Sequence, residues 1–181
     1  MPIIKLTQEQ LHKARPSLDE LSRKPRLPLC AMIEDIRSLY NVGSMFRTAD
    51  GARIEKLYLS GYTGYPPRKE IDKTALGSVE AVPWERTPNP YEVIYRLKKQ
   101  NYSIVCLEQT EESVPYDRAE YKFPLCLIVG NEVSGVSSGV VAECDMAIDI
   151  PMLGLKQSLN VAVAFGIAIY HIAGVCPMKI D

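Results

Sequence analysis

Three polar segments interrupt the apolar stretches of this 181-residue chain, and they carry side chains that could bind a ligand and position a reacting group. They read "NVGSMFRTADG" (41–51), "VGNEVSG" (129–135) and "IPMLGLKQSLN" (150–160). Amide, hydroxyl, carboxylate and guanidinium groups supply hydrogen-bond donors and acceptors, while glycine lets a ligand approach the backbone closely. The segments therefore predict a site built from polar side chains and main-chain groups.

The first segment places an arginine one helical turn beyond a glycine. Asn41 can cap the helix that follows, Gly43 permits close approach, and Arg47 lies on a helix that otherwise carries apolar residues. A lone arginine on a surface helix is usually only solvated. A functional interpretation of Arg47 therefore depends on the other two segments.

The second segment follows an expected strand and makes a tight polar turn. The strand ends in Gly130, and Asn131, Glu132, Ser134 and Gly135 then open a short helix. Glycines permit backbone conformations and close approaches that other residues forbid. The alternative is a turn selected for its geometry alone, and this segment by itself does not separate the two interpretations.

The third segment leads into the most apolar helix of the chain. Pro151 ends a strand, Gly154 allows a bend, and Ser158 and Asn160 stand at the helix entrance. If Ser158 caps the helix, Asn160 falls beyond the cap on an apolar face. Such an intrusion favours a functional role for Asn160.

The elements that position these segments are apolar strands alternating with helices, which is the pattern of a mostly parallel α/β sheet with helices on both faces. Strands are expected at 28–34, 55–61, 102–108, 124–130 and 145–150, and helices at 42–52, at 90–100 and within 156–174. Ligands bind outside the carboxyl ends of the strands in such sheets. The polar segments that follow the strands are therefore candidates for one site.

Two regions do not fit the alternation. Residues 61–84 are rich in Gly, Pro and charge, and a loop of this length inside a compact domain is typically functional. Residues 1–27 are expected to form a short N-terminal arm with a polar helix near 7–15, and residues 28–181 the main domain.

The composition indicates a globular domain, with 46% hydrophobic residues, 24% charged residues and a net charge of -1. The cysteines lack CxxC spacing, the two histidines lack ligand spacing, and neither disulfides nor a metal are expected. The apolar run 159–173 is shorter than the roughly 20 residues that cross a bilayer, and the N-terminus does not read as a signal peptide. A cytoplasmic protein with no membrane association is expected.

Taken together and in order, the three segments resemble the signature motifs of the SpoU (TrmH-type) branch of the SPOUT RNA methyltransferases. Asn41 and Arg47 match the first motif, Gly130 and Glu132 the second, and residues 150–164 the third, with Ser158 and Asn160. The resemblance covers about residues 28–175. It implies S-adenosylmethionine bound in a deep C-terminal trefoil knot, a homodimer, and methylation of a ribose 2'-hydroxyl in tRNA or rRNA.

The resemblance also implies roles for individual residues. Those expected to act in catalysis are Arg47, Asn41, Glu132, Ser158 and Asn160, and those expected to hold the cofactor are Gly130, Ile150, Leu159, Leu107, Met152 and Gly154. A guanidinium has a pKa above about 12 and no acceptor site, so Arg47 is expected to grip an RNA phosphate rather than remove a proton. The RNA-binding candidates are Arg26, Arg68, Lys69 and Lys73.

Two other functions compete with this interpretation. A non-catalytic RNA-binding or assembly factor could keep the same fold, although such a factor is expected to have lost the motif residues, which this chain retains. A dinucleotide-binding enzyme is disfavoured because no GxGxxG follows the first strand. The choice between tRNA and rRNA, and between ribose and base, stays open.

Overall fold

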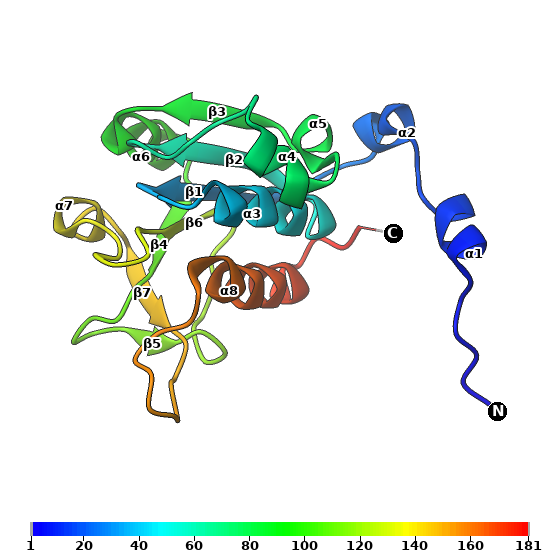
Figure 1. The fold of residues 1–181 in the computed structure, drawn as a ribbon. Helices are drawn as coiled ribbons and strands as arrows, with labels where there is room; N and C mark the ends of the chain where they lie inside the picture. The colour runs from blue at the N-terminus through cyan, green and yellow to red at the C-terminus, as the bar shows by residue number, and fades with distance from the viewer. Residues whose placement is uncertain (1, 181) are drawn as a thin grey trace.

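One parallel sheet forms the centre of the protein in the computed structural model, which describes residues 2–180 (Figure 1). Within these residues the strands are β1 (Leu27–Glu34), β2 (Ile54–Ser60), β3 (Trp84–Thr87), β4 (Ser103–Leu107), β5 (Val114–Pro115), β6 (Leu125–Val129) and β7 (Met146–Asp149). Their order across the sheet is β3-β2-β1-β6-β4-β7-β5, and every neighbouring pair is parallel. The predicted α/β fold is confirmed, and all five predicted strands are present.

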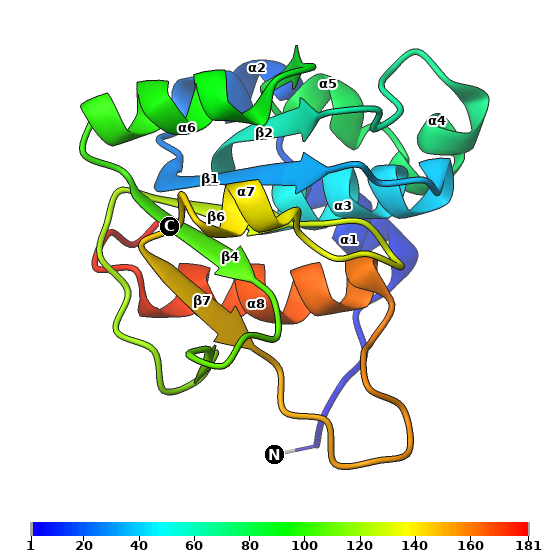
Figure 2. The same ribbon diagram turned by 90° about the vertical axis from the view of Figure 1, so that its left-hand side faces the viewer.

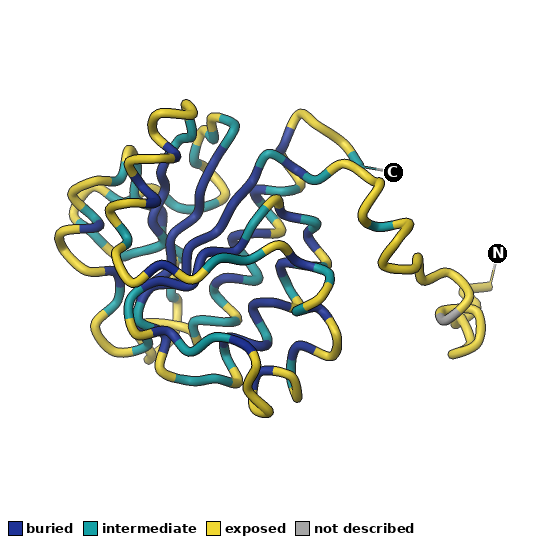
Figure 3. The backbone as a smooth tube through the Cα atoms, turned by 90° about the horizontal axis from the view of Figure 1, so that it is seen from above, coloured by how far each residue is buried: buried dark blue, intermediate teal, exposed yellow. Residues whose placement is uncertain are grey.

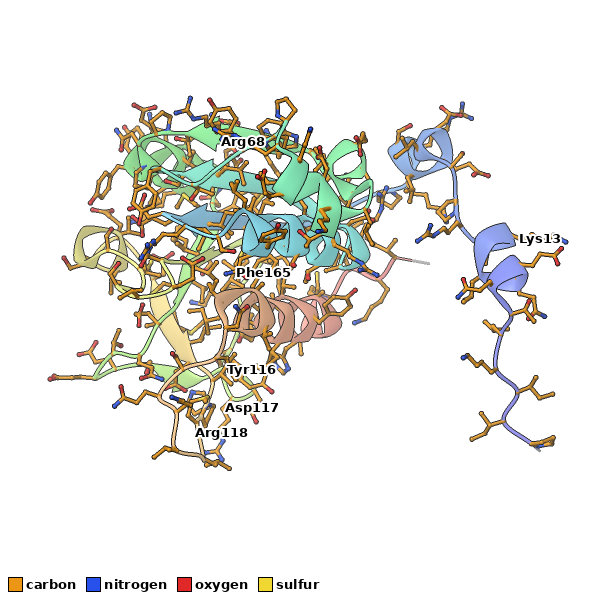
Figure 4. All side chains as sticks on the ribbon, in the orientation of Figure 1. Lys13, Arg68, Tyr116, Asp117, Arg118 and Phe165 are labelled. Carbon is orange, nitrogen blue, oxygen red and sulfur yellow. The ribbon has the colours of Figure 1, made fainter. Side chains whose placement is uncertain are left out.

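Helices cover both faces of the sheet. They are α1 (Gln8–Lys13), α2 (Leu18–Arg23), α3 (Leu39–Gly51), α4 (Lys69–Ala75), α5 (Ser78–Ala81), α6 (Pro90–Lys99), α7 (Ser138–Val141) and α8 (Val161–Val175). Figure 2 shows α6 and α7 on the near face and α3 and α8 behind the strands. Each face has its own buried apolar cluster, and Phe165 of α8 is completely buried in the one that α3 shares (Figure 4). Strands apolar on both sides require this double covering.

The carboxyl ends of the central strands lie at one edge of the sheet. Residues near the ends pair directly, as in Ile33 with Val129 and Leu107 with Ile148. The polar segments predicted to form a site leave the sheet at this edge, because they follow β6 and β7 and the first of them follows β1.

Strand β7 lies between two strands that are consecutive in the chain. It pairs with β4 through Val105 and Met146, and with β5 through Val114 and Ile148. The helix before it, α7, packs on the face that carries α6, and the helix after it, α8, packs on the opposite face. The chain therefore passes from one face of the sheet to the other through β7, which lies between β4 and β5 in the sheet.

The residues that cap α3 and α8 are not those that the sequence suggested, Asn41 and, in the alternative interpretation, Ser158. Helix α3 begins at Leu39, and its N-cap is Ser38, whose Oγ accepts from the backbone N–H of Asn41 at 3.3 Å. Helix α8 begins at Val161, and its N-cap is Asn160, whose Oδ1 accepts from the N–H of Ala162 at 2.9 Å. Asn160 therefore does not intrude on an apolar face, and Ser158 does not cap the helix.

The N-terminal residues project from the body as an exposed arm (Figure 3). Two arginines hold its base. Arg53 donates to the carbonyl oxygens of Leu21 and Lys24, and Arg26 donates to those of Ile54, at 3.1 Å, and Ala81, at 2.6 Å. Helix α1 lies beyond this anchorage (Figure 1). No helix among residues 2–180 is long and apolar enough to span a membrane.

Candidate functional site

A pocket opens at the carboxyl ends of β4, β6 and β7, where two of the polar segments meet. Of the predicted cofactor-binding residues, those that line it are Leu107, Gly130, Ile150, Met152 and Leu159, and of the predicted catalytic residues Glu132 and Ser158 do. Gly154 is not part of the lining and lies in an exposed loop. Asn41, Arg47 and Asn160 also lie outside it.

The turn after β6 accounts for both of its glycines. Asn131 and Gly135 exchange two backbone hydrogen bonds of 3.0 Å, which folds the turn tightly over the strand end. A Cβ at Gly130 would collide with the backbone of Gly135 and Val136. Gly135 has a positive φ of 70°, which favours glycine. Turn geometry alone is therefore a sufficient reason for Gly130 and Gly135, and the evidence for a site comes from the side chains between them.

Glu132 joins this turn to the start of α3. Its carboxylate accepts from the backbone N–H groups of Arg37 and Ser38 and from Nδ2 of Asn41, each at 3.0 Å. Partial burial opposes ionisation, but these hydrogen bonds outweigh it and hold the pKa of Glu132 below its usual value. The Glu132 carboxylate is thus an ionised anchor at a helix N-terminus, not a poised base.

A hydrogen-bonded chain of side chains brings all three polar segments together. Asn160 donates through Nδ2 to Oδ1 of Asn41 at 3.3 Å, and Asn41 in turn donates to Glu132. The partners are 119 and 91 residues apart in the sequence. The predicted grouping of Asn41, Glu132 and Asn160 is therefore seen in the structure, although its catalytic role stays a prediction.

Replacing Glu132 with alanine is expected to lower the free energy of unfolding at pH 7 by about 1–3 kcal/mol, because the donors from Arg37, Ser38 and Asn41 lose a charged acceptor. The folded-state pKa is depressed, so this stabilisation is present above the unfolded-state pKa and is lost as the pH falls through the folded-state value. Urea unfolding of the wild type and Glu132→Ala across pH 3 to 7 measures both effects.

The matched control is Glu143→Ala, which removes a carboxylate that pairs with Lys98 at 2.9 Å on the surface. Surface pairs of this kind contribute at most about 1 kcal/mol. Equal losses for the two variants at pH 7, or a Glu132 effect that is undiminished at low pH, would contradict the anchoring role.

Asn131 is a site residue that sequence reasoning placed only in the turn. Its Oδ1 accepts from the N–H of Val133 at 2.8 Å, and its Nδ2 donates to the carbonyl oxygen of Asp35 and to the hydroxyl of Tyr62, both at 2.8 Å. Only 8% of the residue is exposed. Asn131 therefore ties the turn to the residues that follow β1 and β2. Its position after a strand end was visible in the sequence, but its partners were not.

Leu107 at the end of β4 was predicted to hold the cofactor, but the two residues that follow it, Glu108 and Gln109, were not assigned to the site. Glu108 and Gln109 line the pocket, and Nε2 of Gln109 donates to the carbonyl oxygen of Gln157 at 2.7 Å. This bond fastens the end of β4 to the third polar segment. The same strand-end rule that selected the other segments would have found both residues.

The pocket is anionic. Three of its lining residues, Glu108, Glu132 and Asp149, are acidic, and none is Lys, Arg or His. Glu108 accepts from the N–H of Val136 at 2.8 Å, and Asp149 accepts from the hydroxyl of Ser113 at 2.8 Å. An excess of negative charge around a partly enclosed site favours a ligand that carries positive charge.

Arg47 is exposed on α3, on the side of the helix that also carries Tyr40 and Ser44. Among the described residues no hydrogen bond or ion pair engages its guanidinium, and it does not line the pocket. The structure thus separates Arg47 from the other motif residues. Its five donors are available to a molecule that approaches from outside.

The predicted RNA-binding residues fall into two groups. One group is exposed at α4 and consists of Arg68, Lys69 and Lys73 (Figure 4). Helix α4 packs tightly on α3, and Gly43 permits this because a Cβ there would collide with Thr74. Arg26 instead donates hydrogen bonds to the carbonyl oxygens of Ile54 and Ala81, and burial lowers its pKa. Its contact with RNA stays a prediction. No cluster of three or more potential metal ligands occurs among residues 2–180.

Comparison with protein families gives one match that covers most of the chain. The model of the SpoU rRNA Methylase family matches residues 28–170. Among curated proteins, the chain is 34% identical over 162 residues to a tRNA (guanosine(18)-2'-O)-methyltransferase of Aquifex aeolicus, covering 89% of this chain and 76% of that protein. A putative TrmH family tRNA/rRNA methyltransferase of Staphylococcus saprophyticus is 29% identical, over 81% of this chain and 59% of its own length.

Solved structures give the same grouping. The A. aeolicus TrmH/SpoU tRNA modifying enzyme superposes with a TM-score of 0.78 at 31% identity, covering 92% of this chain and 82% of that one. The SpoU methyltransferase AviRb from Streptomyces viridochromogenes, solved in complex with the cofactor AdoMet, gives 0.76 at 26% identity over 86% of this chain and 64% of its own. The chain thus spans less than two thirds of AviRb and of the staphylococcal relative.

Proposed function

Because the chain belongs to the SpoU rRNA methylase family, we propose that it is an S-adenosylmethionine-dependent RNA methyltransferase that modifies a ribose 2'-hydroxyl of tRNA or rRNA. The observation that carries this proposal is that hydrogen bonds among Asn160, Asn41 and Glu132 join the three motif segments next to the pocket, which Glu132 lines. Residues that match the motifs only by chance would not be expected to lie together in the folded protein. The reaction is assigned to the cytoplasm, where these RNAs are found.

The pocket fits S-adenosylmethionine. When bound, this cofactor supplies a methyl group on a positively charged sulfonium, and the carboxylates of Glu108, Glu132 and Asp149 favour such a cation. Main-chain groups of 129–135 and 150–159 would hold its adenosine, with apolar contact from Leu107, Met152 and Leu159. Gly154 does not line the pocket, so of the six residues expected to hold the cofactor it has the least structural support.

The trefoil knot is supported by the path of the chain around β7. Residues 108–124 leave β4, reach β5 on the far side of β7 and return to β6. On the return path, the ring of Tyr116 packs against His171 of α8, with centroids 5.1 Å apart (Figure 4). In the proposed knot, this continuous loop would surround the segment between β7 and α8. Threading of this kind is one of the rare exceptions to unknotted topology.

The protein's own contribution to the reaction is alignment and charge management. Arg47 binds the phosphate beside the target ribose and stabilises the charge that develops, while the phosphate or a nearby group accepts the proton. A guanidinium offers hydrogen-bond donors and no acceptor, so it suits this role and not that of a base. Glu132 orients the start of α3 and Asn41, as its three hydrogen bonds require.

A homodimer would complete the site. Helix α8 carries exposed apolar residues on its outer side, including Val163 (52% exposed) and Tyr170 (54%), and the loop before it exposes Leu153 completely. A second copy packed on this face would cover these residues. It would also bring the Arg47 of one copy close to the pocket of the other. An exposed apolar patch of this kind marks an interaction surface.

The proposed function is tested by calorimetry followed by methyl transfer. Binding of S-adenosylmethionine but not NAD is expected, and labelled methyl should then appear in small or ribosomal RNA from cells that lack the protein. Mapping of the labelled nucleotide decides between ribose and base. RNA binding without transfer would favour the non-catalytic assembly factor, and binding of NAD would overturn both interpretations.

A further inference from the structure

Tyr62 is exposed at the carboxyl edge of the sheet and yet is fastened at both ends. It follows β2 in the turn that begins at Gly61, whose φ is 63°. Its backbone N–H donates to Oδ1 of Asp35 at 2.9 Å, and its hydroxyl accepts from Nδ2 of Asn131 at 2.8 Å. Nevertheless, 63% of the residue's surface is exposed. The hydrogen bonds fix the position of an aromatic ring that the fold does not use for packing.

The ring lies beside the pocket. Asn131, which holds its hydroxyl, lines the pocket and precedes Glu132. The same amide nitrogen donates to the carbonyl oxygen of Asp35 at 2.8 Å, so the carboxyl ends of β1, β2 and β6 meet beneath Tyr62. A polymer that approaches the pocket from the direction of β2 would come close to this ring, because its hydroxyl contacts the lining residue Asn131.

An exposed aromatic ring that is already fixed loses little side-chain conformational entropy when it binds a flat partner. Most exposed tyrosines must give up side-chain freedom on binding, and this loss reduces the affinity they provide. Tyr95 has the same exposed fraction, 63%, but it lies on α6, which covers a face of the sheet and does not line the pocket, and Lys99 stands over its ring at 4.4 Å. Tyr62 therefore differs from a matched surface tyrosine in its anchorage and in its place next to the pocket.

We propose that the Tyr62 ring is a stacking platform for an unpaired nucleobase of the RNA, next to the ribose that enters the pocket. This proposal rests on the proposed function and names how that site recognises its substrate. Proteins bind single-stranded RNA by stacking splayed bases on aromatic rings, and such contacts tolerate any base because every base has a flat face. The platform therefore positions the substrate without selecting its sequence.

The test compares Tyr62→Ala, Tyr62→Leu and Tyr62→Phe with the control Tyr95→Ala. The measurements are the KM and kcat for unfractionated small RNA from cells lacking the protein, direct binding of that RNA, and the Kd for S-adenosylmethionine. Tyr62→Ala and Tyr62→Leu are expected to raise the KM about tenfold or more and to weaken RNA binding equally. Tyr62→Phe keeps the ring but loses the hydrogen bond from Asn131, so a loss of at most about threefold is expected. Tyr95→Ala is expected to stay within about threefold of the wild type.

Three results would overturn the platform. They are an unchanged RNA affinity in Tyr62→Ala, a Leu variant as good as the Phe variant, and a loss that appears equally in the Kd for S-adenosylmethionine or in the oligomeric state. The failure of the proposed function is distinct from these. If the wild type transfers no methyl group to any RNA, that function is wrong, and the RNA-binding comparison of the same variants still decides whether Tyr62 stacks.

Discussion

Replacing Arg47 with alanine is expected to slow methyl transfer to RNA by at least about a hundredfold and to leave the affinity for S-adenosylmethionine within about twofold. Arg47 is exposed on α3 and lies outside the pocket lining, so its loss leaves the cofactor site intact. The variant does lose the cation that we propose to face the RNA phosphate and the developing charge. Single-turnover rates with labelled cofactor, together with calorimetry, measure the two quantities separately.

Two further variants sharpen this experiment. Arg47→Lys keeps the charge but not the planar fork of donors, and an intermediate rate is expected. Arg96→Ala is the matched control, because Arg96 is a partly exposed arginine on α6 that pairs with Glu85 at 2.7 Å on the other face of the sheet. A normal rate in Arg47→Ala, or an equal loss in Arg96→Ala, would show that Arg47 has no special part in the reaction.

Replacing Val163 with aspartate is expected to convert the proposed dimer into monomers and to reduce the transfer rate by more than tenfold. Val163 lies on the outer side of α8 and is 52% exposed, so the monomer tolerates a charge there. Burying an unpaired carboxylate in an interface costs about 3–5 kcal/mol, which is enough to dissociate an ordinary dimer. Sedimentation velocity measures the mass, and the RNA assay measures the rate.

The control for this change is Tyr95→Asp, which places the same charge at an exposed aromatic residue on α6. It is expected to alter neither mass nor rate. An unchanged dimer in Val163→Asp would place the interface elsewhere, and an active monomer would show that one chain contains the complete site.

The long apolar strands were predictable from sequence because their burial is dictated by composition. The two strands that escaped prediction, β3 and β5, are short edge strands with few fully buried residues, so their sequences carry little hydrophobic signal. Helices α4 and α5 were missed for a related reason. They lie in a segment whose glycines and prolines favour loops, and packing against α3 decides their structure.

Several residues of the site were predictable from the sequence, but the hydrogen bonds that join them were not. Strand ends and polar residue types selected Glu132 and Asn160, yet the sequence could not show that Asn41 lies between them, since the contacts span about half of the chain or more. The capping residues differ from those that the sequence suggested for a local reason. Ser38 and Asn160 compete with Asn41 and Ser158 as equally good capping residues, and only the backbone path selects between them. The exposure of Tyr62 likewise depends on distant elements.

The insertion of β7 between β4 and β5 has a mechanical consequence. An unfolding machine that pulls on the carboxyl end must drag α8 off the sheet and then shear β7 past hydrogen-bonded neighbours on both sides at once. Such resistance raises the barrier to forced extraction, which depends on the unfolding rate rather than on the equilibrium stability. We expect degradation that starts at this end to be slow.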